Sequence, residues 1–189
     1  VNDLAMMGGK PLYLSCGFIL EEGFPTEELS LIADAMGKAA RAAGVSLVTG
    51  DTKVVEKGHG HGVYINTSGI GLIPAGREVG PGRARPGDAV VVSGPIGNHG
   101  MAVMSVREGL EFETTIASDT AALPPLVDLL METSEDVRAL RDPPRGGVAS
   151  ALNELAVASD VGIVLEEALM PVDDAVRAAC ELLGMDPMY

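Results

Sequence analysis

The chain has 189 residues, which fits one large domain or two small ones, and its 47% apolar share is that of a globular protein. Its formal charge of −14, with only 13 dispersed basic residues, argues against nucleic-acid binding, which depends on clustered Lys and Arg. No apolar run approaches the length of a membrane helix, and the two distant cysteines, Cys16 and Cys180, favour a reducing cytoplasm over a disulfide or zinc framework.

The first predicted elements are a short helix, a strand and a long helix. Asn2 and Asp3 are typical of the start of a helix over residues 4–7, where a carboxylate alone is most simply a cap. Residues 11–20 are continuously apolar between glycines and predict a buried strand. Residues 26–44 begin with a threonine cap, carry apolar residues at helical spacing and end in glycine, so they predict an amphipathic helix.

A polar tetrad interrupts the next apolar run, residues 45–55. Gly50, Asp51, Thr52 and Lys53 offer a carboxylate, a hydroxyl and an ammonium group on a backbone that glycine loosens. A magnesium-bound phosphate needs an oxygen ligand, a donor and a cation of this kind. The alternative is a strand interrupted by a polar turn, with Asp51 and Lys53 in a surface ion pair, and the tetrad alone leaves both interpretations open.

Residues 63–73 predict a further strand, the hairpin partner of the strand at 45–55. The connection between them is punctuated by glycines and contains His59 and His61. Two histidines in a flexible turn, without a third histidine or a carboxylate nearby, are expected to be solvated and not to bind a metal.

Residues 74–87 hold the densest run of Gly and Pro and predict a domain boundary. We expect two domains, residues 1–82 and 83–189. The second is expected to contain further strands and helices. The predicted strands cover residues 88–94, 137–140 and 161–165; the predicted helices cover 101–108, 121–133, a stretch following Gly147, and 172–183; residues 111–118 are expected to form an extended loop or edge strand.

Two glycine-rich loops in this second part are candidate anion sites. The loop over residues 94–100 forms either a nest of backbone N–H groups or a plain tight turn. Arg145 stands beside Gly146-Gly147 at a helix start, where a cation and free N–H groups coincide. The alternative for Arg145 is an ion pair with Asp142 in a rigid turn. Cys180 falls on the apolar side of its helix and is expected to be a buried thiol, not a nucleophile.

Seven stretches, in order along nearly the whole chain, resemble the HypE family of hydrogenase maturation factors. They are residues 1–8 (VNDLAMMG), 50–53 (GDTK), 65–69 (INTSG), 97–100 (GNHG), 105–115 (SVREGLEFETT), 141–147 (RDPPRGG) and 151–155 (ALNEL). The wider superfamily includes aminoimidazole ribonucleotide synthetase, selenophosphate synthetase and thiamine-phosphate kinase. The resemblance implies an α/β (α+β) fold of PurM-like two-domain architecture, with a mixed sheet and packed helices in each part.

The resemblance also implies a reaction. HypE-like proteins use ATP and Mg²⁺ to dehydrate a carboxamide carried on the sulfur of their own C-terminal cysteine, and the resulting cyanide becomes a ligand of iron in [NiFe]-hydrogenase. The implied partners are a second copy of the chain, paired through the strands at 45–55 and 63–73, the carbamoyltransferase HypF, and the HypC–HypD complex. The implied location is the cytoplasm.

Site residues follow from the matching motifs. The resemblance implies that Asp3 and Asp51 ligate magnesium, that Thr52 and Lys53 contact the phosphates with Lys53 as a catalytic residue, and that Arg145 contributes to nucleotide binding. Pro144 stands where the family more often has Thr, which removes a hydroxyl from the Arg145 loop.

The family's N-terminal acidic motif falls before Val1, and its Glu-bearing segment and modified cysteine fall beyond Tyr189. We therefore expect a central fragment that does not complete the reaction by itself. The rival interpretations are another ATP-dependent enzyme of the superfamily, like selenophosphate synthetase or thiamine-phosphate kinase, or a non-catalytic module that docks with maturation partners.

Overall fold

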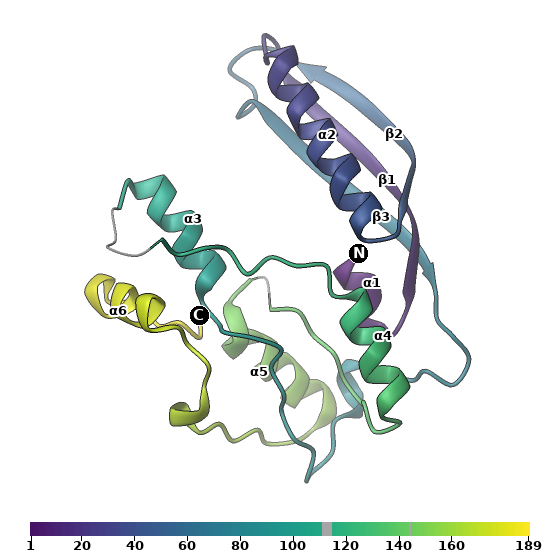
Figure 1. Ribbon diagram of the computed structural model, residues 1–189, viewed down its shortest axis with the longest axis vertical. Coiled ribbons are helices and arrows are strands. Elements are labelled where there is room, and N and C mark those ends of the chain that lie inside the picture. The colour runs from purple at the N-terminus through teal and green to yellow at the C-terminus, as the bar shows by residue number, and fades with distance from the viewer. Residues whose placement is uncertain (111–114, 144) are drawn as a thin grey trace. The chain divides into compact units, whose positions relative to one another are not determined.

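The computed structural model describes residues 1–110, 115–143 and 145–189 (Figure 1). The chain forms two compact units. One holds residues 1–78 and 122–135, and the other holds residues 79–121 and 136–189. The expected boundary between residues 82 and 83 stays a prediction.

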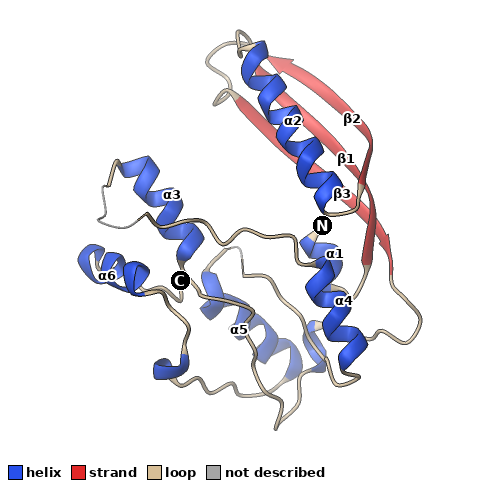
Figure 2. Ribbon diagram, viewed as in Figure 1, coloured by secondary structure: helices blue, strands red, loops and turns tan. Residues whose placement is uncertain are grey.

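The first unit is built on a three-stranded mixed sheet (Figure 2). β1 (Lys10–Glu21) lies in the middle, with β2 (Ser46–Val55) parallel on one side and β3 (Val63–Leu72) antiparallel on the other. The helix α2 (Thr26–Ala42) connects the two parallel strands. The predicted hairpin between β2 and β3 is therefore wrong, because the parallel crossover places β2 on one edge of β1 and leaves the other edge for β3.

α2 lies along one face of this sheet (Figure 2). On β1 the residues of that face are buried, with Cys16 7% and Leu20 8% exposed, whereas Ile19, which points the other way, is 45% exposed. Tyr13, Tyr64 and Ile70 are exposed on that second face as well. We call this uncovered side of the sheet the open face.

Two further helices complete the first unit. α1 (Asn2–Met6) precedes β1, and α4 (Pro124–Thr133) comes from much later in the chain and packs against α1 and β1. Pro124 is the first residue of α4, as its lack of an N–H predicts. α1 starts earlier than predicted: Val1 is the cap, so Asn2 and Asp3 lie inside the helix.

The second unit contains α3 (Asn98–Glu108), α5 (Gly147–Ser159) and α6 (Asp174–Leu183), with short 3₁₀ turns at Pro81–Arg83 and Glu167–Leu169. Its core joins α3 to α6 through Met101, Val176, Ala179 and Cys180. The prediction of a buried Cys180 thiol is confirmed, and burial raises the pKa of that thiol.

The strands predicted at residues 88–94, 137–140 and 161–165 are not formed, and the described residues of the second unit contain no sheet. Val91 and Val164 are 86% and 91% exposed. An apolar run becomes a strand only when a neighbouring strand pairs its backbone groups, and these runs have no such neighbour in the described part of the unit. Of the predicted extended loop at 111–118, residues 111–114 lie outside the described residues.

The mixed α/β class is nevertheless confirmed by the first unit, with its mixed sheet and packed helices. Across the described ranges, no helix combines the length and the apolar character needed to cross a membrane.

Candidate functional site

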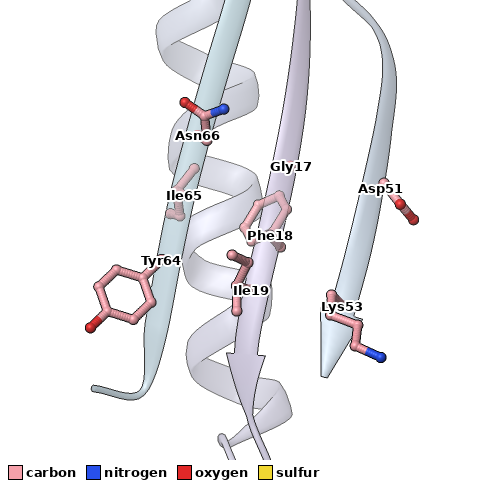
Figure 3. A pocket seen from close by; sticks show the side chains of 8 residues that line it. All are labelled: Gly17, Phe18, Ile19, Asp51, Lys53, Tyr64, Ile65 and Asn66. Atoms are coloured by element: carbon pink, nitrogen blue, oxygen red, sulfur yellow. The ribbon is translucent and has the colours of Figure 1, made fainter. Parts of the chain in front are cut away.

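A hollow on the open face brings two residues of the polar tetrad together. Three strands contribute to it, with β1 in the middle (Figure 3). Its lining consists of Gly17, Phe18, Ile19, Asp51, Lys53, Tyr64, Ile65 and Asn66. Asp51 and Lys53 come from β2 and share this hollow because residues two apart on a strand point to the same side.

The sheet register arranges the polar groups of the hollow in two rows. Gly17 is paired with Asp51 on one side and with Asn66 on the other. In the next row Ile19 lies between Lys53 and Tyr64. Gly17 has no side chain and separates Asp51 from Asn66, and the Asp51 carboxylate points away from β1 (Figure 3).

Thr52 points away from its two neighbours in the tetrad. β2 runs without interruption through Thr52, so the alternative of a polar turn is wrong and the hydroxyl lies on the side opposite Asp51 and Lys53. Thr52 lines a second hollow along β2, which Asp51 also lines, and the Thr52 backbone N–H donates to Asp51 Oδ1 at 2.8 Å. Gly50 is required for packing, because a Cβ there would overlap the carbonyl of Cys16 on β1.

Asp3 belongs to neither hollow. It is exposed on α1, and the neighbouring Leu4 of that helix packs over Gly69 together with Leu14. Leu14 alternates with Cys16 on the covered side of β1, so α1 packs on the face opposite the hollow of Asp51. The two predicted magnesium ligands are thus not brought into one hollow.

Arg145 lies in the second unit and is exposed. The predicted helix start is present, since α5 begins at Gly147 after Gly146 with a left-handed φ of 68°. One of its first amides is already bound, because the Ala149 N–H donates to the Met188 carbonyl at 3.1 Å. Pro144, which stands where the family more often has the hydroxyl-bearing Thr, lies outside the described residues.

The alternative ion pairs are not the ones formed. Among the described residues, Arg141 and not Arg145 makes the ion pair of its loop, with Nη2 2.5 Å from Glu154 Oε2. In the same described ranges Asp51 and Lys53 make no ion pair with each other. Both groups of the open-face hollow therefore remain exposed to solvent.

The glycine-rich loop between β2 and β3 is held by a carboxylate that the sequence pattern did not reveal. Glu21, at the end of β1, accepts the N–H groups of Gly58 at 2.6 Å and Gly62 at 3.0 Å. These two hydrogen bonds, the one from Gly58 foremost, lower the pKa of Glu21. His59 and His61 are exposed, and the described residues contain no group of three or more His, Cys, Asp or Glu side chains placed to hold a metal ion.

Sequence reasoning also missed Tyr64 and Asn66, which form the β3 side of the hollow (Figure 3). Asn66 is an amide in a strand of mainly apolar and small residues, and such a polar residue at the same alternation as Tyr64 was the available signal. This signal could assign Asn66 to the hollow only if β3 was known to pair with β1, and the predicted hairpin paired β3 with β2 instead.

Comparisons with known proteins identify the relatives of the chain. The N-terminal domain model of AIR synthase related proteins matches residues 1–73, and the C-terminal domain model matches residues 85–189. A carbamoyl dehydratase HypE from Cupriavidus necator is 57% identical over the whole chain. The chain spans about half the length of such curated relatives, 54% in this case.

Two solved structures are similar over all of the chain. A HypE in complex with ATP has a TM-score of 0.97 at 48% identity, and the chain covers 56% of it. A HypE–HypF complex also gives 0.97, at 52% identity, with 62% of that chain covered. The resemblance to the HypE family is thereby confirmed, and the chain belongs to the AIR synthase related protein family as a HypE-like member.

Proposed function

We propose that the chain is the nucleotide-binding part of an ATP-dependent carbamoyl dehydratase. The reaction converts the S-carboxamide of a protein cysteine to an S-cyanate, which supplies the cyanide ligand for [NiFe]-hydrogenase. Support comes from the 57% identity to a protein named carbamoyl dehydratase HypE and from the similarity to a HypE that binds ATP.

ATP makes chemical sense for this dehydration. An amide oxygen is a poor leaving group, and transfer of a phosphoryl group to it turns its departure into the loss of phosphate. Removal of the protons from the nitrogen then closes the carbon–nitrogen triple bond. Charge develops on the phosphate oxygens during the transfer, so cations placed beside them lower the barrier.

The open-face hollow supplies groups suited to this task. Lys53 offers an ammonium group for phosphate oxygens, and Asp51 offers a carboxylate ligand for Mg²⁺. One carboxylate is compatible with this role, because Mg²⁺ is commonly held by one or two carboxylates plus substrate phosphates and water. When bound, Mg²⁺ would neutralise phosphate charge; Asp3, Thr52 and Arg145 are proposed as further contacts to the nucleotide.

The proposal extends to partners and location. The exposed apolar residues of the open face, among them Tyr13 and Ile70, suit a homodimer contact. A solved HypE–HypF complex supports HypF as a partner, and the HypC–HypD complex is proposed as the acceptor of the cyanide. The cytoplasm is proposed because Cys16 and Cys180 are both free thiols.

The observation that carries the proposal is the shared hollow of Asp51 and Lys53 in a chain so similar to HypE. Isothermal titration of the 189-residue chain with Mg-ATP tests it. We expect binding, and we expect Lys53→Ala to weaken it by about 10- to 100-fold, as for loss of a charge-assisted hydrogen bond of about 1.5–3 kcal/mol. Lys38→Ala is the matched control, because Lys38 is an exposed lysine on α2, which covers the other face. Absence of binding, or equal loss in both variants, contradicts the proposal.

A chimera tests the reaction itself. In it, this chain replaces the matching residues of the Cupriavidus necator relative. With ATP and Mg²⁺, mass spectrometry should show that the S-carbamoylated cysteine loses one water, about 18 Da, and the loss should be abolished by Lys53→Ala and retained by Lys38→Ala. Transfer of phosphate without this loss of mass would favour a kinase-like member of the superfamily.

A further inference from the structure

β2, the strand of the polar tetrad, does not pair regularly with β1. The two strands pair Leu14 with Leu47, but the next pair along the ladder joins Ser15 to Thr49. Val48 is therefore left out of the ladder and is the extra residue of a β-bulge. Bulges are rare in parallel pairs, and they are over-represented at sheet edges and next to active sites, where they re-aim side chains. β2 is both parallel to β1 and an edge strand of its sheet.

This extra residue decides which face of the sheet the two charged groups occupy. Paired residues on neighbouring strands share a face, so Asp51 lies on the open face with its partner Gly17, and Lys53 lies there with its partner Ile19. A ladder without the bulge would shift β2 by one residue and pair Lys53 with the buried Leu20 instead. Because such a shift moves every side chain beyond it to the other face, both charges would leave the hollow.

A glycine accompanies the bulge. Gly50 lies just beyond the extra residue and is paired with Cys16, whose carbonyl a Cβ on Gly50 would overlap. A second bulge shows the same combination, since Leu12 is extra in the pairing of β1 with β3 and a Cβ on Gly71 would overlap the Lys10 carbonyl. Glycine within a strand often marks a bulge or a close approach of two backbones. In this sheet it marks both together, so each bulged pairing requires a residue without a side chain.

We propose that the bulge at Val48, which Gly50 permits, sets the register of β2 and so turns Asp51 and Lys53 to the open face. Val48 and Gly50 are positioning residues in this scheme, and neither contacts the nucleotide. The inference rests on the proposed function, in which the hollow of Asp51 and Lys53 binds Mg-ATP. It gives Gly50 a role in the tetrad although glycine offers the nucleotide no side chain.

Gly50→Ala tests this register role. The added Cβ excludes the bulged pairing, so β2 should slip to the regular ladder and carry Lys53 to the other face. Isothermal titration with Mg-ATP should then show the same loss of affinity as Lys53→Ala, about 10- to 100-fold. Deletion of Val48 from the Gly50→Ala variant should restore the affinity, because the shortened strand forms the same pairs in a regular ladder where a Cβ fits. Alanine that merely destabilised the fold would not be rescued by a deletion.

A disulfide reports the register without any nucleotide. Cys16 is paired with Gly50 in the bulged ladder and would be paired with Thr49 in the regular one. In Thr49→Cys alone the two thiols lie on opposite faces, so mild oxidation should leave them unlinked. When Gly50→Ala is added, they share a face on neighbouring strands about 4.8 Å apart, a separation that suits a disulfide. Peptide mapping should then show a bond between Cys16 and the introduced cysteine.

Gly71→Ala is the matched control, because it creates the same kind of overlap at the other bulge and leaves the ladder between β1 and β2 unaltered. Combined with Thr49→Cys, it should give no disulfide. If Gly50→Ala does not fold, deletion of Val48 alone decides. The shortened chain should keep its affinity for Mg-ATP, and in Thr49→Cys its thiols should stay unlinked. Loss of binding, or a disulfide, in the shortened chain would refute the register role.

The two measurements separate this inference from the proposed function. If the unaltered chain binds no Mg-ATP, the proposed function fails, and the disulfide still tests the register by itself. If the unaltered chain binds Mg-ATP, the register role is refuted when Gly50→Ala binds it equally well or leaves Cys16 unlinked.

Discussion

Glu21 shows how a single carboxylate organises a loop made largely of glycine. Residues 56–62 have little side-chain packing to hold them, and glycine loses more backbone entropy on ordering than other residues. The two N–H groups that Glu21 accepts, from Gly58 and Gly62, offset that cost at the end of the loop nearest the sheet. The same loop links β2 to β3, the strands that supply both sides of the open-face hollow.

The pH dependence of stability follows from this contact. The pKa of Glu21 is lower in the folded chain than its ordinary value of 4.5, because Gly58 and then Gly62 donate to the carboxylate. The unfolded chain therefore binds the proton more readily, so the contact stabilises the fold above that ordinary value and its contribution is lost as pH falls through the folded pKa.

Glu21→Gln should accordingly lower the Tm at pH 7, because an NH₂ donor then faces an N–H donor, and the difference from the unaltered chain should shrink as pH falls below the ordinary value of 4.5. Calorimetry over a pH series measures it. Glu22→Gln, at the exposed neighbouring position, is the control and should show no such convergence. A gap that stays constant with pH would show that the Glu21 carboxylate is not the cause.

At the scale of elements, local pattern determined most helices and the strands of the first unit, while pairing and long-range contacts decided the rest. The continuous apolar run at residues 11–20 and the helical periodicity of residues 26–44 predicted their elements correctly without knowledge of any partner. The pairing of β3 could not be predicted from its own residues, because an apolar strand pairs with whichever strand edge is free. The runs at 88–94 and 161–165 have the same composition as a buried strand, and only the absence of a paired neighbour in the described residues tells them apart.

The candidate site likewise contains some features that the sequence predicts and others that it does not. Asp51 and Lys53 are two apart in a strand, so their common side follows from the sequence, as does the separation of Thr52. The hydrogen bond that Asn2 Oδ1 accepts from the Leu123 N–H does not follow from the sequence, because the two residues are 121 positions apart. No local signal distinguishes a cap residue for its own helix from one that binds the start of another.

The start of α5 offers a prediction about an element. Its Gly147 has a φ of 60°, and a Cβ there would overlap the carbonyl of Met188, which also accepts the Ala149 N–H. Gly147→Ala should destabilise the chain by about 1 kcal/mol from the left-handed backbone and by about 1–3 kcal/mol more from the overlap. Gly184→Ala shares the backbone cost at a φ of 68°, and none of the described atoms lies near its Cβ.

Urea denaturation of both variants measures this difference, together with exchange of the Ala149 amide. We expect the larger loss of stability and the faster exchange in Gly147→Ala. Equal losses in the two variants would mean that the segment at Met188 is not packed on α5 in solution.

At the scale of the whole molecule, both units bury apolar residues, and four of the exposed large apolar residues of the first unit lie on the open face of its sheet. Tyr13, Ile19, Tyr64 and Ile70 are each more than 40% exposed on the open face. Strand pairing arranges these residues as two apolar pairs, Tyr13 opposite Ile70 and Ile19 opposite Tyr64, and the rows Ser15–Ser68 and Gly17–Asn66 lie between the two pairs. Apolar patches of this kind commonly mark association surfaces.

Ile19 and Tyr64 also line the hollow of Asp51 and Lys53, so the proposed homodimer contact is tested at the other pair. Ile70 is 66% exposed and does not line the hollow of Asp51 and Lys53. In a twofold dimer each substitution occurs twice in the interface, so Ile70→Glu should weaken association by about 2 kcal/mol or more, roughly 30-fold in Kd. Leu31→Glu, at an exposed position of α2, introduces the same charge away from the open face and should leave the sedimentation coefficient concentration-dependent as in the unaltered chain. Analytical ultracentrifugation distinguishes the outcomes, and dimers that persist in Ile70→Glu and dissociate in Leu31→Glu would place the contact on the helical side instead.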